Sequence, residues 1–225
     1  DWPTIEAGLR ARKNAVRRMP AWDMYRNLNT RLAAPVEGFA PPDHWNRKQL
    51  RSMGRVSQLA VRASELALTD AGLLGDPLLR SGRVGIASGS SVGSTPDIGD
   101  FGELLLTGES KGLNANSYVR MMPHTTGANI GIFFGLRGRI ISTSTACTSG
   151  SQGVGFAYEA IKHGYQDVML GGGAEELCPS EAMAFDMLYA TSQRNDDPGS
   201  TPRPYDRDRD GLGLGEGGGL LVLEA

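Results

Sequence analysis

The chain has 225 residues, of which 40% are hydrophobic and 21% charged, and its formal net charge is −2 at pH 7. This composition is that of a globular protein, and no apolar run is long enough for a membrane span or arranged as a signal peptide, so we expect a soluble, cytoplasmic chain without membrane contacts. Cys147 and Cys178 form neither a disulfide framework nor a clustered metal site, so we expect no metal.

Charge is distributed unevenly along the chain. Residues 1–62 carry a balance of +7, and residues 63–225 carry a balance of −9. Ordinary solvated helix faces explain part of the basic excess, and the remainder favours a docking surface for an acidic partner. No aromatic stacking platform or zinc module accompanies the arginines, so we expect an acidic protein as the partner and no nucleic acid.

Helical periodicity and glycine or proline punctuation divide the chain into alternating elements. The expected helices cover residues 1–19, 50–72, 101–106, 119–134, 153–164 and 180–190. The expected strands cover residues 83–88, 140–145, 167–170 and 219–224, and the rest of 94–117 is expected to be a loop. Strands that alternate with helices indicate an α/β architecture with a largely parallel mixed sheet.

Residues 140–155 carry the most specific chemical signal. A β-branched run that predicts a buried strand stops at Ala146 and Cys147, and small residues then lead into a helix. Cys147 therefore lies where a strand meets the first turn of a helix, where unpaired N–H groups and the helix dipole favour an anion such as a thiolate. We interpret Cys147 as a nucleophile, with a small core residue as the alternative. The same loop could bind a phosphate, but no Walker lysine follows it.

Two further glycine-rich segments match known motifs in the wrong context. Residues 89–93 fit the G-x-S-x-G nucleophile elbow, but Pro96 and Gly99 interrupt the helix that this motif requires. Residues 213–218 fit the dinucleotide-binding G-x-G-x-x-G pattern, but they precede a strand instead of following one. We expect both segments to be tight turns, and we expect no cofactor.

Four motifs occur in order along the chain. They are TACTSG at 145–150, GGGAEELC at 171–178, ATSQRNDDP at 190–198, and RPYDRDRDG at 203–211 followed by GEGGGLLVLE. Together they resemble the β-ketoacyl-acyl-carrier-protein synthases of synthase I/II type, in the thiolase superfamily. The resemblance covers essentially the whole chain and implies a thiolase-like αβαβα layered sandwich built from two similar halves. Residues 1–225 would form one ketosynthase domain, the amino-terminal half, without its first strand and without the carboxy-terminal half.

The resemblance implies an acyltransferase of fatty acid biosynthesis. Such an enzyme takes an acyl group onto a cysteine from an acyl carrier protein, and malonyl-acyl-carrier protein then loses carbon dioxide and attacks the thioester. Cys147 matches that nucleophile, with its own N–H as half of an oxyanion hole. The family's catalytic histidines and lysine belong to the second half, so we expect this chain alone not to condense. A type II polyketide ketosynthase remains an alternative, as does a non-catalytic subunit like a chain-length factor, although the cysteine counts against the latter.

The resemblance also assigns roles to residues outside the nucleophile. The residues that match an acyl pocket, each of which could equally be simple core packing, are Val92, Met122, Ala146 and Phe185. Met122 matches a residue that reaches across the interface of a homodimer. The residues that match the docking surface for the acidic carrier protein are Lys48, Arg51 and Lys111.

Overall fold

The computed structural model describes residues 2–110 and 112–225. The chain forms two compact units. The larger unit combines Ala40–Glu176 with Gly217–Ala225, and the smaller unit combines the residues up to Phe39 with Leu177–Glu216. Within the described ranges, no helix is both long enough and apolar enough to cross a bilayer.

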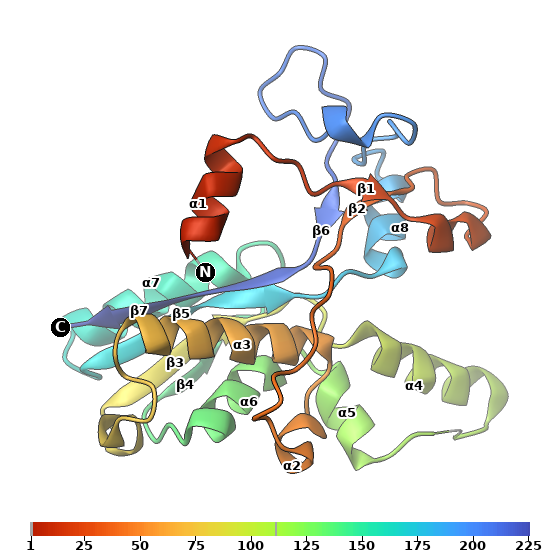
Figure 1. Ribbon diagram of the computed structural model, residues 1–225. Coiled ribbons are helices and arrows are strands. Elements are labelled where there is room, and N and C mark those ends of the chain that lie inside the picture. Colours follow the sequence, from red (N-terminus) through yellow and green to blue (C-terminus); the bar gives the residue numbers. More distant parts are fainter. Residues whose placement is uncertain (1, 111) are drawn as a thin grey trace. The chain divides into compact units, whose positions relative to one another are not determined.

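A four-stranded sheet forms the centre of the larger unit (Figure 1). Its strands are β3 (Val84–Gly89), β4 (Ile140–Ser142), β5 (Val168–Glu175) and β7 (Gly217–Glu224). They lie in the order β4-β3-β5-β7, with β3 parallel to both β4 and β5, and β7 antiparallel to β5. The predicted α/β class with a largely parallel mixed sheet is therefore confirmed.

Helices cover both faces of this sheet. The helices involved are α3 (Arg55–Asp70), α6 (Thr125–Phe134) and α7 (Ser149–Lys162). Helices α3 and α6 contact each other and the sheet, and α7 packs on β3 and β5 from the opposite face (Figure 1). A glycine allows α7 to come this close, because a Cβ on Gly153 would lie 2.5 Å from the Gly172 carbonyl oxygen and 2.7 Å from that of Ala87. The result is an α/β/α arrangement inside the larger unit.

The rest of the larger unit consists of short helices. They are α2 (Arg47–Leu50), the 3-10 helix η2 (Pro77–Arg80), α4 (Thr95–Thr107) and α5 (Ala115–Met121). The interrupted helix expected near 101–106 is instead the longer α4, because Pro96 occupies its first turn, where a missing N–H costs nothing. A helix does follow the turn at 89–93, so that objection to a nucleophile elbow was wrong.

Two other expectations in this unit need correction. The helix expected over 119–134 is divided in two, with residues 119–121 at the end of α5 and α6 beginning at Thr125. It is interrupted because Pro123 keeps Met122 before it in an extended conformation with ψ of 124°. The strand expected over 140–145 ends at Ser142, and Ile140 remains 47% exposed. It is not buried because β4 forms an edge of the described sheet.

The smaller unit contains a three-stranded sheet that the sequence pattern did not predict. Its elements are α1 (Trp2–Arg10), β1 (Arg17–Arg18), η1 (Pro20–Met24), β2 (Leu32–Ala34), α8 (Pro179–Met187), η3 (Pro198–Ser200) and β6 (Leu214–Gly215). The helix expected over 1–19 was wrong beyond Arg10, because the chain turns through Arg12 with a φ of 51° and then enters β1. Strands of two or three residues are too short to show an alternating pattern.

A buried carboxylate ties two helix starts to the end of β5. Glu176 is 2% exposed and follows β5 directly. It accepts hydrogen bonds from the N–H of Val56 at 3.0 Å and from the N–H and Oγ1 of Thr95, both at 2.8 Å. These donors lie in the first turns of α3 and α4, where a helix leaves N–H groups unpaired and favours negative charge.

Replacing this carboxylate should destabilise the larger unit. We expect Glu176→Ala to lower the free energy of unfolding of the full-length protein by about 3 kcal/mol, because the buried N–H of Val56 and the half-buried N–H of Thr95 lose their acceptor. Urea unfolding followed by circular dichroism measures this change. The control is Glu103→Ala, which removes an exposed carboxylate from α4 and should change stability by less than about 0.5 kcal/mol. Equal effects of the two substitutions would contradict the capping role.

Candidate functional site

Cys147 is exposed and lies in the turn between β4 and α7, as predicted from the sequence. The residue before it, Ala146, has a φ of 53°. A side chain in this left-handed region costs roughly 1–2 kcal/mol, so the surrounding structure must hold the turn in place. The turn therefore presents Cys147 to solvent in a conformation that the chain would not adopt without support.

Hydroxyl groups supply that support. The Oγ of Ser149 donates to the Ala146 carbonyl at 2.6 Å and accepts from the N–H of Thr145 at 2.9 Å. The Oγ1 of Thr143 donates to the Ser149 carbonyl at 2.8 Å, and the Oγ1 of Thr148 donates to the Thr145 carbonyl at 2.8 Å. Ser149 and Thr143 are both buried, so water does not compete for their bonds. These bonds hold the turn in its conformation.

The position of the turn suits a nucleophile. It follows β4, one of the parallel strands, and immediately precedes the 14-residue helix α7. The first N–H groups of a helix have no partner inside it, and the helix dipole is positive at this end. An oxyanion that develops beside Cys147 would therefore be stabilised by backbone amides.

The turn that carries Val92 packs against the turn that carries Cys147. A Cβ on Gly89 would lie 2.7 Å from the carbonyl oxygen of Thr143 and 2.8 Å from the Cβ of Ser149, so only glycine allows this approach. Val92 itself is half-buried. The predicted pocket residue Val92 and the nucleophile thus lie on neighbouring segments.

The same glycine turn packs against the segment that carries Met122. A Cβ on Gly93 would lie 2.5 Å from the carbonyl oxygen of Met121 and 2.9 Å from the nitrogen of Pro123. Met122 is half-buried and lies between these two residues. Three of the predicted pocket positions, Val92, Met122 and Ala146, therefore lie on contiguous segments of the larger unit.

Sequence reasoning missed one residue that holds this arrangement. Glu175, the last residue of β5, accepts from the Oγ of Ser90 at 2.7 Å and from the N–H of Ser91. These bonds fix the turn that carries Val92. The available signal was a pair of acidic residues at the carboxyl end of a strand, the edge where parallel sheets place functional groups.

The fourth predicted pocket residue, Phe185, belongs to the smaller unit and is half-buried. It packs against a buried cluster made of Trp22, Leu28, Ala33, Ala182 and Leu214. Its neighbour Asp186 is 2% exposed and accepts from the N–H of Asn29 at 2.7 Å and from the Oγ1 of Thr191 at 2.6 Å. Burial raises the pKa of Asp186, but hydrogen bonds from Thr191, Asn29 and Thr30 outweigh burial and lower it overall.

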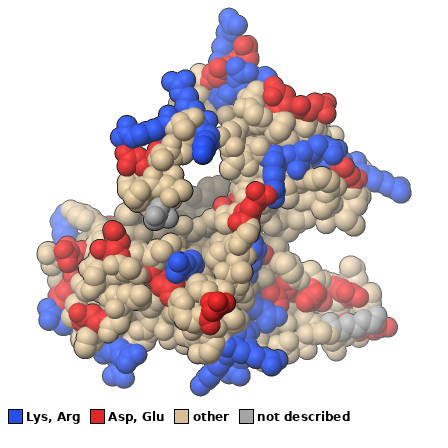
Figure 2. Space-filling model, viewed as in Figure 1, with Lys and Arg blue, Asp and Glu red and all other residues tan. Residues whose placement is uncertain are grey.

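The predicted docking residues lie at α2. Lys48 belongs to this helix, Arg51 follows it, and both side chains are exposed. Figure 2 shows basic side chains gathered at the lower edge of the larger unit, where Figure 1 places α2. Lys111, the third predicted docking residue, lies outside the described residues. Beside α2 is a cavity of about 400 Å³ lined by Asn46, Lys48, Gln49, Arg51, Ser52, Met53, Asn116, Asn129, Ile132 and Phe133.

The two cysteines should differ in reactivity towards iodoacetamide. Cys147 is exposed, whereas Cys178 is buried and its Sγ accepts from the N–H of Ser180 at the start of α8. We expect native full-length protein to be alkylated at Cys147 at least about tenfold faster than at Cys178, because reaction requires access to the sulfur. Peptide mass spectrometry measures both rates, and comparable rates would contradict the described geometry.

Asp186 should make stability depend on pH. Because its pKa is lower in the folded protein than the unfolded value of about 3.9, its stabilisation is full above that value and is lost as pH falls through the folded pKa. We expect Asp186→Asn to lower the melting temperature at pH 7, with a smaller difference from wild type at about pH 3. Thermal unfolding checks this against Asp196→Asn, which changes an exposed carboxylate. A constant difference across this range would contradict the assignment.

Comparison with known proteins identifies relatives along the whole chain. The sequence model described as the β-ketoacyl synthase, N-terminal domain, matches residues 3–225. The crystal structure of a β-ketoacyl synthase from Burkholderia phymatum is similar with a TM-score of 0.97 and 58% identity, over 100% of this chain and 55% of that chain. The predicted thiolase-like fold of the amino-terminal half is thereby confirmed.

Curated relatives come from two groups of β-ketoacyl synthases. The 3-oxoacyl-[acyl-carrier-protein] synthase 2 of Vibrio cholerae is 36% identical over 88% of this chain and 48% of its own length. A putative polyketide β-ketoacyl synthase 1 of Streptomyces halstedii is 34% identical over 99% of this chain and 53% of its own length. The chain thus spans about half the length of these relatives. It belongs to the β-ketoacyl synthase family and corresponds to the amino-terminal domain of that family.

Proposed function

We propose that the whole protein is an acyltransferase that makes β-ketoacyl-acyl-carrier protein by decarboxylative condensation in fatty acid synthesis, with Cys147 as its nucleophile. The observation that carries the proposal is the exposed Cys147 on a positive-φ turn at the start of α7. A thiolate is both a good nucleophile and a fair leaving group, which a two-step acyl transfer requires.

In the first step, the Sγ of Cys147 attacks the carbonyl carbon of an acyl thioester on the carrier protein. The new S–C bond forms as the bond to the carrier's sulfur breaks, and the released thiolate takes up the proton that Cys147 gave up. Amides at the start of α7 would stabilise the intermediate oxyanion. The acyl chain would then lie against Val92, Met122 and Ala146 of the larger unit. The family resemblance implies a contact with Phe185 as well.

In the second step, the bond between the malonyl carboxylate and its α-carbon breaks and carbon dioxide leaves. The electron pair that remains on that carbon forms a new C–C bond to the acyl carbonyl, and Cys147 leaves as a thiolate. The histidines and lysine that the family resemblance implies for the second half would stabilise charge on the malonyl thioester. This chain supplies the acyl-enzyme half of the reaction.

The acyl carrier protein would dock at the surface formed by Lys48 and Arg51, with Lys111 as a third contact. Relatives named for their action with an acyl carrier protein support this partner. Exposed cations speed encounter with an acidic protein and set its orientation. The protein would act in the cytoplasm as a homodimer, in which Met122 reaches the partner's acyl pocket.

A polyketide ketosynthase is the second candidate function, because similarity to polyketide β-ketoacyl synthases extends over nearly the whole chain. Both candidates use Cys147 in the same way and differ in the acyl chain that the pocket accepts. Comparing saturated acyl carriers with poly-β-keto carriers as substrates would separate them.

The nucleophile is tested in the full-length enzyme. We expect Cys147→Ala to reduce the condensation rate by at least about 10³-fold, because the proposed acyl thioester forms on the sulfur that this substitution removes. The control is Cys178→Ser, which preserves a capping group at the start of α8 and should retain activity within twofold. Turnover of acyl- and malonyl-carrier protein measures both, and full activity in Cys147→Ala would refute the proposal.

A further inference from the structure

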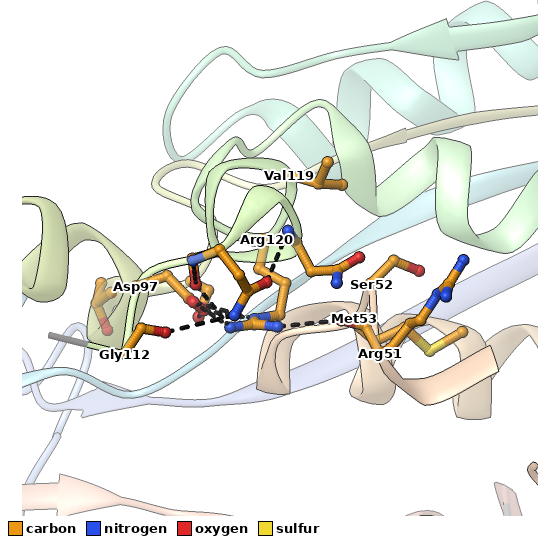
Figure 3. A network of polar contacts seen from close by, with 12 residues as sticks. Arg51, Ser52, Met53, Asp97, Gly112, Val119 and Arg120 are labelled. Carbon is orange, nitrogen blue, oxygen red and sulfur yellow. Dashed lines mark hydrogen bonds and ion pairs between the residues drawn. The ribbon is translucent and has the colours of Figure 1, made fainter. Parts of the chain in front are cut away.

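The backbone that follows α2 is held by side chains from two other helices. The Nη1 of Arg120 in α5 donates to the carbonyl of Arg51 at 3.0 Å. The Nδ2 of Asn129 in α6 donates to the carbonyl of Ser52 at 3.1 Å, and the Oγ of Ser52 donates back to Asn129 Oδ1 at 2.9 Å. Side chains therefore hold two consecutive carbonyls of the docking segment, which comprises residues 48–53. Figure 3 shows the bond from Arg120 to Arg51.

Arg120 is itself held by a buried carboxylate. Its Nε lies 2.9 and 3.0 Å from the two carboxylate oxygens of Asp97, and its Nη2 lies 2.6 Å from one of them. Asp97 is 6% exposed and also accepts from the Oγ of Ser94 at 2.8 Å. The hydrogen bonds to Asp97 raise the pKa of Arg120, so the guanidinium keeps its charge. Its fork geometry lets one side chain serve both Asp97 and the Arg51 carbonyl.

The docking segment is anchored by the buried Met53, but one side of it borders open space. The cavity of about 400 Å³ lies beside it, and Arg51, Ser52 and Met53 line that cavity together with Asn116 and Asn129. On the side that faces the cavity, side-chain packing does not hold the backbone of this segment. Hydrogen bonds therefore contribute more to its position there. The side chains of Arg120 and Asn129 donate hydrogen bonds to these two carbonyls.

We propose that Arg120 is a positioning residue for carrier-protein recognition, which holds the segment of Lys48 and Arg51 in the shape that binds the acidic partner. This inference rests on the docking role proposed above. A segment that already has its binding conformation loses little conformational entropy when the partner binds. The binding free energy is therefore more favourable than for a flexible segment. Arg120 touches no reacting atom and acts through the position of Arg51.

The contacts of the Arg120 side chain can be tested separately from the hydrogen bond that its backbone makes. Its backbone carbonyl accepts from the N–H of Ser94 at 3.1 Å, near the turn that carries Val92. That bond remains when only the side chain is changed. Variants of the guanidinium therefore test the link to Arg51 and Asp97 while the backbone contact to the acyl-pocket turn is kept.

The test compares two acyl donors for acylation of Cys147 in the full-length enzyme. One donor is the acyl carrier protein, and the other is a small acyl thioester of N-acetylcysteamine, which has no docking surface. We expect Arg120→Gln to raise KM for the carrier about tenfold and to change KM for the small thioester less than twofold. Arg120→Lys should raise the carrier KM about threefold, because one ammonium group cannot serve both acceptors, and it provides the same test should Arg120→Gln not fold. The matched control Arg83→Gln removes a cation paired with Asp167 before β3 and should leave both values unchanged.

A double variant distinguishes failure of this inference from failure of the docking proposal. In Lys48→Ala/Arg51→Ala, which keeps the backbone carbonyls, Arg120→Gln should add less than twofold to the carrier KM, because the groups it positions are gone. A persisting tenfold penalty in that background, or an equal rise for both donors, would overturn the positioning role alone. An unchanged carrier KM in Lys48→Ala/Arg51→Ala itself would overturn the docking surface and this inference together.

Discussion

One strained turn determines what the larger unit can do. Ala146 adopts a positive φ, and the buried hydroxyl of Ser149 bonds the backbone on both sides of it. If this turn relaxed, Cys147 would leave the start of α7, and the amides there would no longer face a reacting carbonyl. The strain is compensated by hydrogen bonds that form only when β4 and α7 are both in place. The position of the nucleophile at the start of α7 thus depends on the fold around it.

Two adjacent carboxylates at the end of β5 hold the neighbouring glycine turn and two helix starts in the same unit. Glu175 fixes the glycine turn that carries Val92, and Glu176 joins the starts of α3 and α4 to the same end of β5. Further along α4, Asp97 holds Arg120, which reaches the docking segment at Arg51. Polar contacts and helix α4 therefore link the carboxyl end of β5 to the surface proposed to bind the carrier protein.

The sequence predicted those features that depend on local pattern. The β-branched run and the small residues around Cys147 located the turn, because strand and helix periodicities meet there. The pairing of Arg120 with Asp97 spans 23 positions and that of Asn129 with Ser52 spans 77, so no local pattern could indicate them. Pro96 was taken as a helix breaker although it stands in a first turn, where proline is tolerated. The strands of the smaller unit were missed because their pairing is set by tertiary contacts.

The most direct test of the central claim is to locate the acyl group on the enzyme. Full-length protein would be incubated with acyl-carrier protein in the absence of malonyl-carrier protein, digested, and analysed by peptide mass spectrometry. The account predicts one acyl thioester, on the peptide that contains Cys147, and none on the peptide that contains Cys178. An acyl group attached to any other residue, or a stable absence of acylation in active enzyme, would contradict it.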